Sequence, residues 1–308
     1  MRFRRILVGV DLALAGDRVT FGSARAVEQA LRLARPSGAE IVFVHSTWAD
    51  MHEEDQAIRP GPSAEGTHVL EGLVAEAAAS SVRARLELVR ERAWLELIRA
   101  VQRGEGDLVI VGRHNQEAGG AAMGGMARKL LRKCPCPVWI VRPEGRADLG
   151  TVVAATDLTA VGNRAVELGG ELAATGGGTL HVVHAWPLPV RLPVLPELEP
   201  PVETRLELQA LESSARERLE TALRSMHLPV EPRTHLSCGA ASVVIRESVA
   251  RLDADLLVMG TVSRGGIAGL LLGNTAERLL DRVSCSLLTI KPRDFVSPVS
   301  APPAGNVA

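Results

Sequence analysis

The chain contains one pattern of segments twice, and this repeat limits the folds that it can adopt. The matched pairs are ILVGVD (6–11) with VVAATD (152–157), VFVHSTW (42–48) with HVVHAW (181–186), DLVIVG (107–112) with DLLVMG (255–260), and LLRKCPCPVWIVRP (130–143) with LLDRVSCSLLTIKP (279–292). Matched positions recur at a spacing of about 140 to 150 residues, which predicts a duplicated domain.

Each repeat alternates short apolar runs, typical of buried strands, with helical periods. In the first half this pattern predicts strands at 5–10, 40–44, 85–89, 107–111 and 137–141, and helices at 16–35, 68–80, 94–101 and 126–133. The run at 85–89 alternates in polarity, as an exposed edge strand does. We therefore predict an α/β fold: two flavodoxin-like or Rossmann-like, doubly wound, five-stranded parallel sheets in tandem.

The repeat also predicts the domain organisation. We expect a first domain at 1–145, a second at 149–295 and a disordered tail at 296–308. An insertion, Pro187–Pro201, distinguishes the second half, and its prolines favour a stiff, extended path. Its leucines and valines either pack on the protein's own surface or line a groove for an apolar ligand.

Composition narrows the classes of function. The formal net charge of -1 argues against a general electrostatic grip on nucleic acid or anionic lipid, although it leaves a local basic patch open. The basic start runs directly into a strand without a cleavage site, and no apolar run approaches the roughly 20 residues that span a bilayer. With four cysteines and no secretory segment, we expect a cytoplasmic, reduced protein.

The segment Asp255–Thr275 carries the strongest functional signal. A short apolar run stops at Gly260, a loop rich in small residues follows, and Gly273-Asn274-Thr275 opens a helix. Glycines let backbone N–H groups approach a ligand closely, and the first turn of a helix attracts anions. The pattern thus favours a phosphate site, while the alternative is a turn whose glycines serve only its backbone.

These segments resemble the universal stress protein family, in which the last glycine-rich loop follows G-x2-G-x9-G-[ST] and wraps the phosphates of a nucleotide. The resemblance covers both halves, nearly the entire chain, and is greatest to the tandem members of the family. It implies that the two halves are related by a pseudo-twofold and pair through their final strands, 137–141 and 286–290. It also implies ATP as the ligand, with Mg²⁺ when ATP is bound.

The resemblance carries over a set of nucleotide-binding residues in the second half: Ala155, Thr156, Asp157, Ala185, Met259, Gly260, Ser263, Arg264, Gly273, Asn274 and Thr275. It implies that residues 155–157 hold the adenine side and that Ala185 packs near the base. Residues 259–260 lie under the ribose and phosphates, 273–275 offer N–H groups to the phosphates, and Arg264 is the nearest cation. Such sites form where a doubly wound sheet reverses its strand order.

The two halves depart from the family pattern to different degrees. In the second half Ser263 replaces a glycine, which costs about 1 to 2 kcal/mol if a left-handed backbone is needed, and Asn274 replaces Ser or Thr. In the first half Asn115 stands at the middle glycine, and Met126 removes a hydroxyl from the cradle. We predict that the first half is structural or binds something else, with Asp11 capping the next segment or hydrogen-bonding locally.

The sequence gives little support for a histidine-based site, a metal site, a serine hydrolase or a phosphate-transferring loop. His45 and His184 end equivalent strands, and we expect each to be partly buried and hydrogen-bonded there. Cys134 and Cys136 are one residue apart with Pro135 between, a spacing that makes capture of one metal ion awkward, so packing as small apolar residues is expected and thiol redox sensing is the alternative. The chain has no G-x-S-x-G elbow and no G-K-[ST] phosphate loop.

The sequence therefore predicts a non-enzymatic stress-response protein that binds ATP in its second half and acts through protein partners not identified by sequence. The sequence is also compatible with a homodimer. A carrier or scaffold for an apolar molecule and a weak nucleotide hydrolase are the alternatives. No catalytic residue and no metal ligand is predicted.

Overall fold

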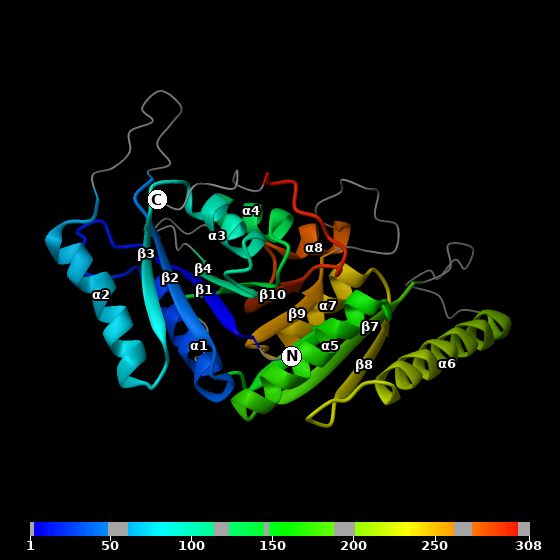
Figure 1. Cartoon of the computed structure of the whole chain (residues 1–308). Helices are drawn as coiled ribbons and strands as arrows, with labels where there is room; N and C mark the ends of the chain where they lie inside the picture. The colour runs from blue at the N-terminus through cyan, green and yellow to red at the C-terminus, as the bar shows by residue number, and fades with distance from the viewer. Residues whose placement is uncertain are drawn as a thin grey trace. The chain divides into compact units, whose positions relative to one another are not determined.

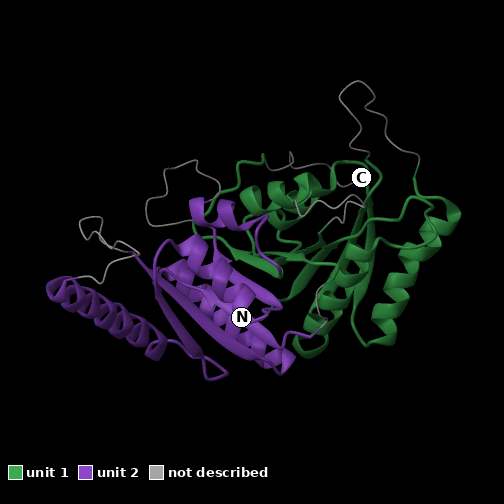
Figure 2. Cartoon of the chain, turned by 180° about the vertical axis from the view of Figure 1, so that it is seen from behind, with its two compact units in different colours: residues 1–147, 285–308 green, residues 148–284 purple. Residues whose placement is uncertain are grey.

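The structure, a computed structural model, describes residues 3–48, 61–113, 123–144, 148–187, 201–261 and 273–300 (Figure 1). The chain forms two compact units (Figure 2). Unit 1 contains residues 1–147 and 285–308, and unit 2 contains residues 148–284. The last strand of the second half thus belongs to unit 1.

Unit 1 is built on a sheet whose strand order is β3-β2-β1-β4-β5-β10. Its strands are β1 (Arg5–Gly9), β2 (Glu40–Ser46), β3 (Ala84–Val89), β4 (Leu108–Gly112), β5 (Val138–Val141) and β10 (Ser286–Ile290). The first five are parallel, in the order of a doubly wound sheet, and β3 lies at the edge as its alternating polarity predicted.

Four helices of the first half connect these strands: α1 (Phe21–Ser37), α2 (Ala64–Ala79), α3 (Ala93–Gln102) and α4 (Gly125–Lys133). Helix α1 packs on β1 and β4, α2 packs on β3, and α3 packs on β2 and on α4. Thr20 caps α1 by accepting a hydrogen bond from Ser23 N at 3.3 Å, and the helix ends at Gly38, whose φ is 69°.

Unit 2 repeats this arrangement with the parallel strand order β9-β6-β7-β8. Its elements are β6 (Thr151–Ala155), α5 (Ala160–Gly176), β7 (Thr179–Trp186), α6 (Val202–Arg224), β8 (Arg233–Cys238), α7 (Ala241–Arg251), β9 (Leu256–Gly260) and α8 (Asn274–Leu279). The predicted α/β fold with its duplicated pattern is therefore confirmed.

Strand β10 pairs antiparallel with β5 in unit 1. Leu288 lies opposite Trp139, with Leu287 opposite Ile140 and Thr289 opposite Val138. These five apolar side chains and Thr289 are buried, so the pairing removes apolar surface from water on both strands. A bare strand edge of this kind would be prone to association.

The core is aliphatic, as expected for a chain with 3% aromatic residues. The largest fully buried side chains are Trp139, Phe43, Ile6, Leu7, Ile41, Leu70, Leu97, Ile98, Leu108, Ile110, Leu130 and Leu131. They come from central strands and from the sheet-facing sides of α2, α3 and α4 in unit 1. Among the described helices, none combines the length and the apolar character needed to cross a membrane.

Two predicted helix starts were wrong. The helix expected from residue 16 begins at Phe21, because residues before Thr20 form a small loop closed by an antiparallel bridge between Leu12 and Val19. The helix expected from about residue 68 begins at Ala64, because Ser63 accepts a hydrogen bond from Gly66 N at 3.1 Å. In both places a capping side chain sets the boundary.

The C-terminal tail also differs from its prediction where the structure describes it. Val299 is 9% exposed, and Gln102 Nε2 donates a hydrogen bond to its carbonyl oxygen at 2.7 Å. This contact holds the first residues of the predicted disordered tail against α3 of unit 1. Residues 301–308 lie outside the described part of the chain.

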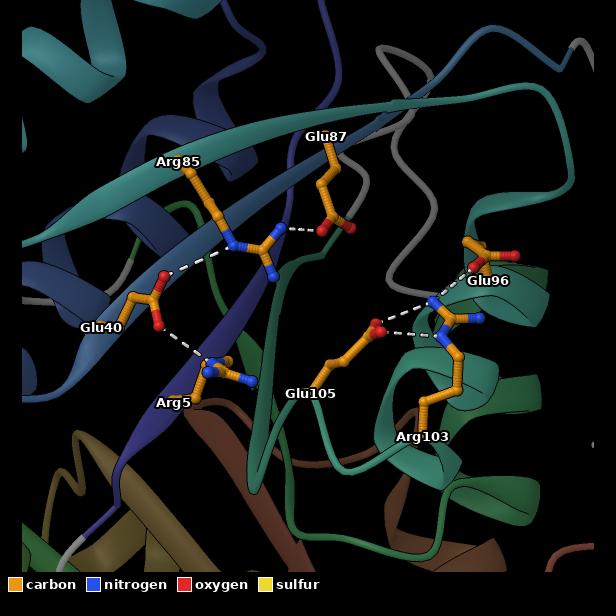
Figure 3. A network of polar contacts seen from close by, with 7 residues as sticks. All are labelled: Arg5, Glu40, Arg85, Glu87, Glu96, Arg103 and Glu105. Atoms are coloured by element: carbon orange, nitrogen blue, oxygen red, sulfur yellow. Dashed lines mark hydrogen bonds and ion pairs between the residues drawn. The ribbon is translucent and has the colours of Figure 1, made fainter. Parts of the chain in front are cut away.

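Charged side chains line the sheet of unit 1 around its edge strand (Figure 3). Glu40 pairs with Arg5 Nε at 3.0 Å and with Arg85 Nε at 3.4 Å, and Arg85 also pairs with Glu87 on its own strand. Each pair is partly exposed, so it contributes at most about 1 kcal/mol to stability. Charges on an edge strand also discourage pairing with other chains.

A second group of charges lies beside the first (Figure 3). Arg103 donates to Glu96 at 2.8 Å and to Glu105 at 2.8 and 3.0 Å. The hydrogen bonds from Arg103 lower the pKa of Glu105, and those to Glu105 and Glu96 raise the pKa of Arg103. This group ties the end of α3 to the turn before β4.

Candidate functional site

The carboxyl ends of three neighbouring strands meet in unit 2. Ala155, at the end of β6, is in register with Met259 of β9 and with Val183 of β7. The next residue, Thr156, donates its backbone N–H to Val183 O at 3.0 Å. The sheet thereby brings residues 155–157, Met259–Gly260 and the end of β7 to one edge, as the sequence predicted for a doubly wound sheet.

The turn after β6 is fixed by local hydrogen bonds. Thr156 is 6% exposed, and its Oγ1 accepts from Leu158 N at 2.9 Å. Leu158 has a φ of 63°, a left-handed conformation that is uncommon for a residue with a side chain. Asp157 is exposed, and its Oδ1 accepts from Thr159 N at 3.0 Å and from Thr159 Oγ1 at 2.5 Å. The turn therefore holds the Asp157 carboxylate in one orientation at the surface.

Helix α5 packs closely against this turn. Thr159 caps the helix by accepting from Gly162 N at 3.2 Å. A Cβ atom on Gly162 would lie 2.7 Å from Asp157 Oδ1 and 2.7 Å from Thr156 Oγ1, so only glycine fits there without a shift. Thr159 and Gly162 were not predicted as site residues. The Asp-Leu-Thr sequence before a helix was the available signal, since Thr is a preferred cap.

A buried histidine supports the same strand end. His184 is 6% exposed, and its Nδ1 lies 2.8 Å from Thr156 O. In unit 1, His45 is 9% exposed and its Nδ1 lies 2.9 Å from Val10 O. Both histidines thus hydrogen-bond the backbone where a central strand ends, which confirms the structural role predicted for them.

The two ends of the glycine-rich loop are held together. Gly273 donates its N–H to Thr261 O at 2.5 Å, directly after β9, and Gly273 is the N-cap residue of α8. Asn274 is exposed, and Thr275 is partly exposed. The predicted contacts Ser263 and Arg264 lie outside the described residues, as do residues 188–200 of the insertion. Helix α8 ends at Leu279.

Gly260 contributes a close approach at the end of β9. A Cβ atom on Gly260 would lie 2.9 Å from Val161 Cγ1 of α5. Met259 is 4% exposed and Ala155 is 7% exposed, while Ala185 is partly exposed. Small or buried residues thus form the floor of this edge.

The matching place in unit 1 is built differently. Thr20 N donates to Asp11 O at 2.8 Å, and Asp11 N donates to Ser23 Oγ at 2.8 Å, so the backbone of Asp11 is hydrogen-bonded to the start of α1. The capping or local bonding expected of its side chain stays a prediction. The connection from Asp11 to Thr20 is longer than the one from Asp157 to Thr159. A Cβ atom on Gly112 would lie 2.2 Å from the carbonyl carbon of Gly22, so α1 lies directly on the end of β4.

Within the described ranges, no three His, Cys, Asp or Glu side chains form a group that could hold a metal ion. Cys134, Cys136 and Cys285 are buried, and Cys238 is exposed; all four are free thiols. Burial of Cys134 and Cys136 agrees with their predicted packing as small apolar residues.

Comparison with known proteins extends these observations. A profile described as the universal stress protein family matches residues 2–142 and 149–291. Universal stress protein E of Photorhabdus laumondii is 29% identical over 273 residues, which cover 81% of this chain and 82% of that protein. Universal stress protein E of Escherichia coli strain K12 is 35% identical over 180 residues, 55% of each chain.

Solved structures share the fold across nearly the whole chain. A protein of unknown function from Pseudomonas aeruginosa PAO1 superposes with a TM-score of 0.71 at 23% identity, covering 95% of this chain and 94% of that one. A universal stress protein from Archaeoglobus fulgidus gives a TM-score of 0.59 at 16% identity, with coverage of 94% and 98%. These likenesses concern the fold alone.

Proposed function

The chain belongs to the universal stress protein family with two tandem domains, and from this we propose that it is a stress-response protein that binds ATP in its second half. In this proposal the protein is not an enzyme, works in the cytoplasm and acts through contacts with partner proteins. Domain 1 spans 1–145 and domain 2 spans 149–295.

The observation that carries the proposal is the edge of the sheet in unit 2 where the two ends of the glycine-rich loop are hydrogen-bonded to each other. The hydrogen bond from Gly273 N to Thr261 O brings the start of α8 to the end of β9, whose Met259 is in register with Ala155. Because the Gly273 N–H is used in that bond, the N–H groups of Asn274 and Thr275, in the first turn of α8, would donate to the phosphate oxygens. The Asp157 carboxylate, oriented by Thr159, accepts hydrogen bonds and so suits the amino group of adenine or a ribose hydroxyl.

Two glycines fix the backbone around this edge. Gly162 and Gly260 leave no space for a Cβ atom against the Asp157 turn and α5, so the backbone at this edge keeps a fixed form. Met259, Gly260, Ala185 and residues 273–275 would line the nucleotide, with Ser263 and Arg264 as predicted loop contacts. Mg²⁺, when present with ATP, would neutralise phosphate charge.

The residues of the glycine-rich loop agree with binding of ATP without its rapid hydrolysis. The glycine-rich loop carries no lysine of the G-K-[ST] kind, which phosphate-transferring loops use to stabilise charge in the transition state. We propose also that the final strands join the two halves within one chain, which the antiparallel pairing of β10 with β5 supports.

The test compares matched carboxylates in the full-length protein. We expect Mg-ATP to raise the free energy of unfolding, by about 2.7 kcal/mol at 100 times its dissociation constant. Asp157→Ala should weaken binding, measured by calorimetry and thermal unfolding. Asp11→Ala, the same change at the matching position of the first half, should leave it unaltered. Phosphate release should not exceed that of buffer.

Two results would contradict the proposal. One is the absence of both a thermal shift and binding by equilibrium dialysis at millimolar ATP. The other is loss of binding in Asp11→Ala with binding retained in Asp157→Ala, which would move the site to the first half.

A further inference from the structure

Helix α4 of unit 1 carries only basic charges on its solvent side. Its buried residues are Ala127, Leu130 and Leu131, and the helix contains no Asp or Glu. The partly exposed positions from residue 128 to residue 133 are all cations: Arg128, Lys129, Arg132 and Lys133. The overall charge of the chain left a local basic patch open, and the solvent side of α4 is such a patch.

Two of these cations are held on one aromatic ring. Helix α3 packs beside α4 (Figure 1) and brings Trp94 against both lysines. Lys129 Nζ lies 5.2 Å from the centroid of the Trp94 ring, and Lys133 Nζ lies 5.0 Å from it. In the described ranges, both ammonium groups make their contacts with this ring and not with a carboxylate. An aromatic ring attracts a cation without neutralising it, so the two lysines keep their charge for a ligand.

The dipole of the helix explains only part of this charge. Arg132 and Lys133 lie in the last turn, where a cation is favourable. Arg128 lies close to the first turn, where a cation is unfavourable, and like charges four residues apart repel each other. Elsewhere in unit 1 arginines pair with carboxylates, as Arg103 does (Figure 3). The stability of α4 therefore does not account for its charge.

The matching helix of the second half has a different charge pattern. The alignment of residues 130–143 with 279–292, extended two residues towards the N-terminus, places Glu277 opposite Arg128 and Asp281 opposite Arg132. The two lysines have arginines opposite them, Arg278 and Arg282. Cations and carboxylates thus balance at these positions in the second half, so the repeated fold does not require the excess charge of α4.

Charge complementarity identifies the chemistry of the ligand. Cations four residues apart on a helix have Cβ atoms about 5 to 6 Å apart, and carboxylates one turn apart on a partner helix have the same spacing. Nucleic acid fits less well. Its backbone continues beyond a helix of nine residues, about 14 Å long, and over a protein with a net charge of -1.

We propose that the solvent side of α4, with Lys129 and Lys133 at its centre, binds an acidic helical segment of a partner protein. This inference rests on the proposed function, which includes contacts with partner proteins, and it adds the chemistry of the partner. Paired charges at a partly exposed surface speed association and are screened by salt.

The experiment measures binding of a fluorescein-labelled helical peptide, with glutamate at every fourth position, to the full-length protein by fluorescence anisotropy. A second peptide has glutamine at those positions. We expect the glutamate peptide to bind, its affinity to fall as salt is added, and the glutamine peptide not to bind. Arg128→Glu combined with Arg132→Asp introduces the residues of the second half and should lower the affinity about tenfold or more.

A matched variant separates the patch from the overall charge. Arg218→Glu combined with Arg224→Asp makes the same change in net charge on exposed positions of α6, and it should leave the peptide affinity unaltered. Circular dichroism shows whether each variant is folded. Lys129→Gln combined with Lys133→Gln, which should also weaken binding, replaces the first variant if that variant does not fold.

ATP binding is tested separately from this inference. The α4 variants should keep the thermal shift with Mg-ATP, and Asp157→Ala should keep the peptide affinity. Failure of the peptide to bind would thus leave the ATP proposal intact, and the reverse also holds.

Three results would overturn the inference. The first is equal binding of the glutamate and glutamine peptides. The second is an unchanged affinity for the glutamate peptide in the folded α4 variants. The third is tighter binding of labelled single-stranded DNA than of the glutamate peptide at the same salt concentration, lost in the same variants, which would assign the patch to nucleic acid.

Discussion

Gly162 affects both the packing of α5 against the Asp157 turn and the proposed binding site. A Cβ atom there would lie 2.7 Å from Asp157 Oδ1 and from Thr156 Oγ1. Overpacking of this kind costs about 1 to 3 kcal/mol, and the turn that carries Asp157 must move to relieve it. Gly162→Ala should therefore weaken ATP binding by about tenfold or more, measured by calorimetry.

The matched control for this change is Gly72→Ala, on the exposed side of α2. A Cβ atom on Gly72 would meet nothing within 4 Å. Alanine there should stabilise the protein by up to about 1 kcal/mol without altering ATP affinity. Equal affinities in Gly162→Ala and the natural protein would mean that the Asp157 turn is not part of the binding site.

The stacked histidines of unit 2 make stability depend on pH. His181 Nδ1 lies 2.8 Å from His235 Nε2, with ring centroids 5.1 Å apart. Burial, then the neighbouring imidazole and Arg233, lower the pKa of His181; burial, then Arg251 and Arg233, lower the pKa of His235. The unfolded chain therefore takes up protons near pH 6.5 before the folded pair does, so the free energy of unfolding falls as the pH drops below about 6.5.

Replacement of one ring tests this dependence. His181→Val introduces valine, the residue type found at the matching position of β2, Val42. It removes one of the two titrating groups. Urea unfolding between about pH 7.5 and about pH 5.5 should show a smaller loss of stability in this variant than in the natural protein. Equal losses would indicate that other groups dominate the acid side.

At the scale of elements, the caps of α5 and α1 offer a second matched pair. Thr159 accepts from Gly162 N and donates to Asp157, while Thr20 accepts from Ser23 N. Removal of either cap should cost about 1 kcal/mol of stability. Thr159→Ala should also weaken ATP binding, because it releases the Asp157 carboxylate, whereas Thr20→Ala should not. Calorimetry and urea unfolding of both variants provide the measurement, and a loss of affinity in Thr20→Ala would contradict it.

Strands and helix starts differ in how well they can be predicted from the sequence. Apolar runs such as Leu256–Met259 identify buried strands, because burial on both faces leaves an unambiguous composition. Helix starts are harder to predict from the sequence. The loop before Thr20 depends on a bridge between Leu12 and Val19, and no periodicity in the sequence indicates this bridge. The capping residues Thr20 and Ser63 are the clue in the sequence that marks these two starts.

The candidate site is predictable in part for the same reason. Strand ends follow from strand positions, so the sequence alone is enough to put Thr156 and Met259 at one edge of the sheet. The role of Gly162 cannot be predicted in this way, because it depends on distances between side chains and backbone that the sequence spacing does not give. The separation of the Cys134 and Cys136 sulfurs, 3.6 Å, is likewise not given by the sequence, because the same spacing is compatible with sulfurs that converge or diverge.

At the scale of the whole molecule, sequence halves and compact units do not coincide. Strand β10 comes from the second half, yet it belongs to unit 1, where Leu288 lies opposite Trp139 and is fully buried. Stability of unit 1 should therefore depend on residues far along the chain. A truncation before residue 285 would remove a strand that its sheet needs.

Leu288→Ala tests this dependence without truncation. Shortening a fully buried leucine should cost about 2 to 5 kcal/mol. Because Leu288 packs in unit 1, hydrogen exchange should accelerate most in β4 and β5, and less in β6 and β7, when measured by mass spectrometry. The control is Leu257→Ala in β9, which is in register with Val153 and should accelerate exchange in β6 and β7 instead. If both variants accelerated exchange in the same strands, the two units would unfold as one, and β10 would stabilise the second half as much as the first.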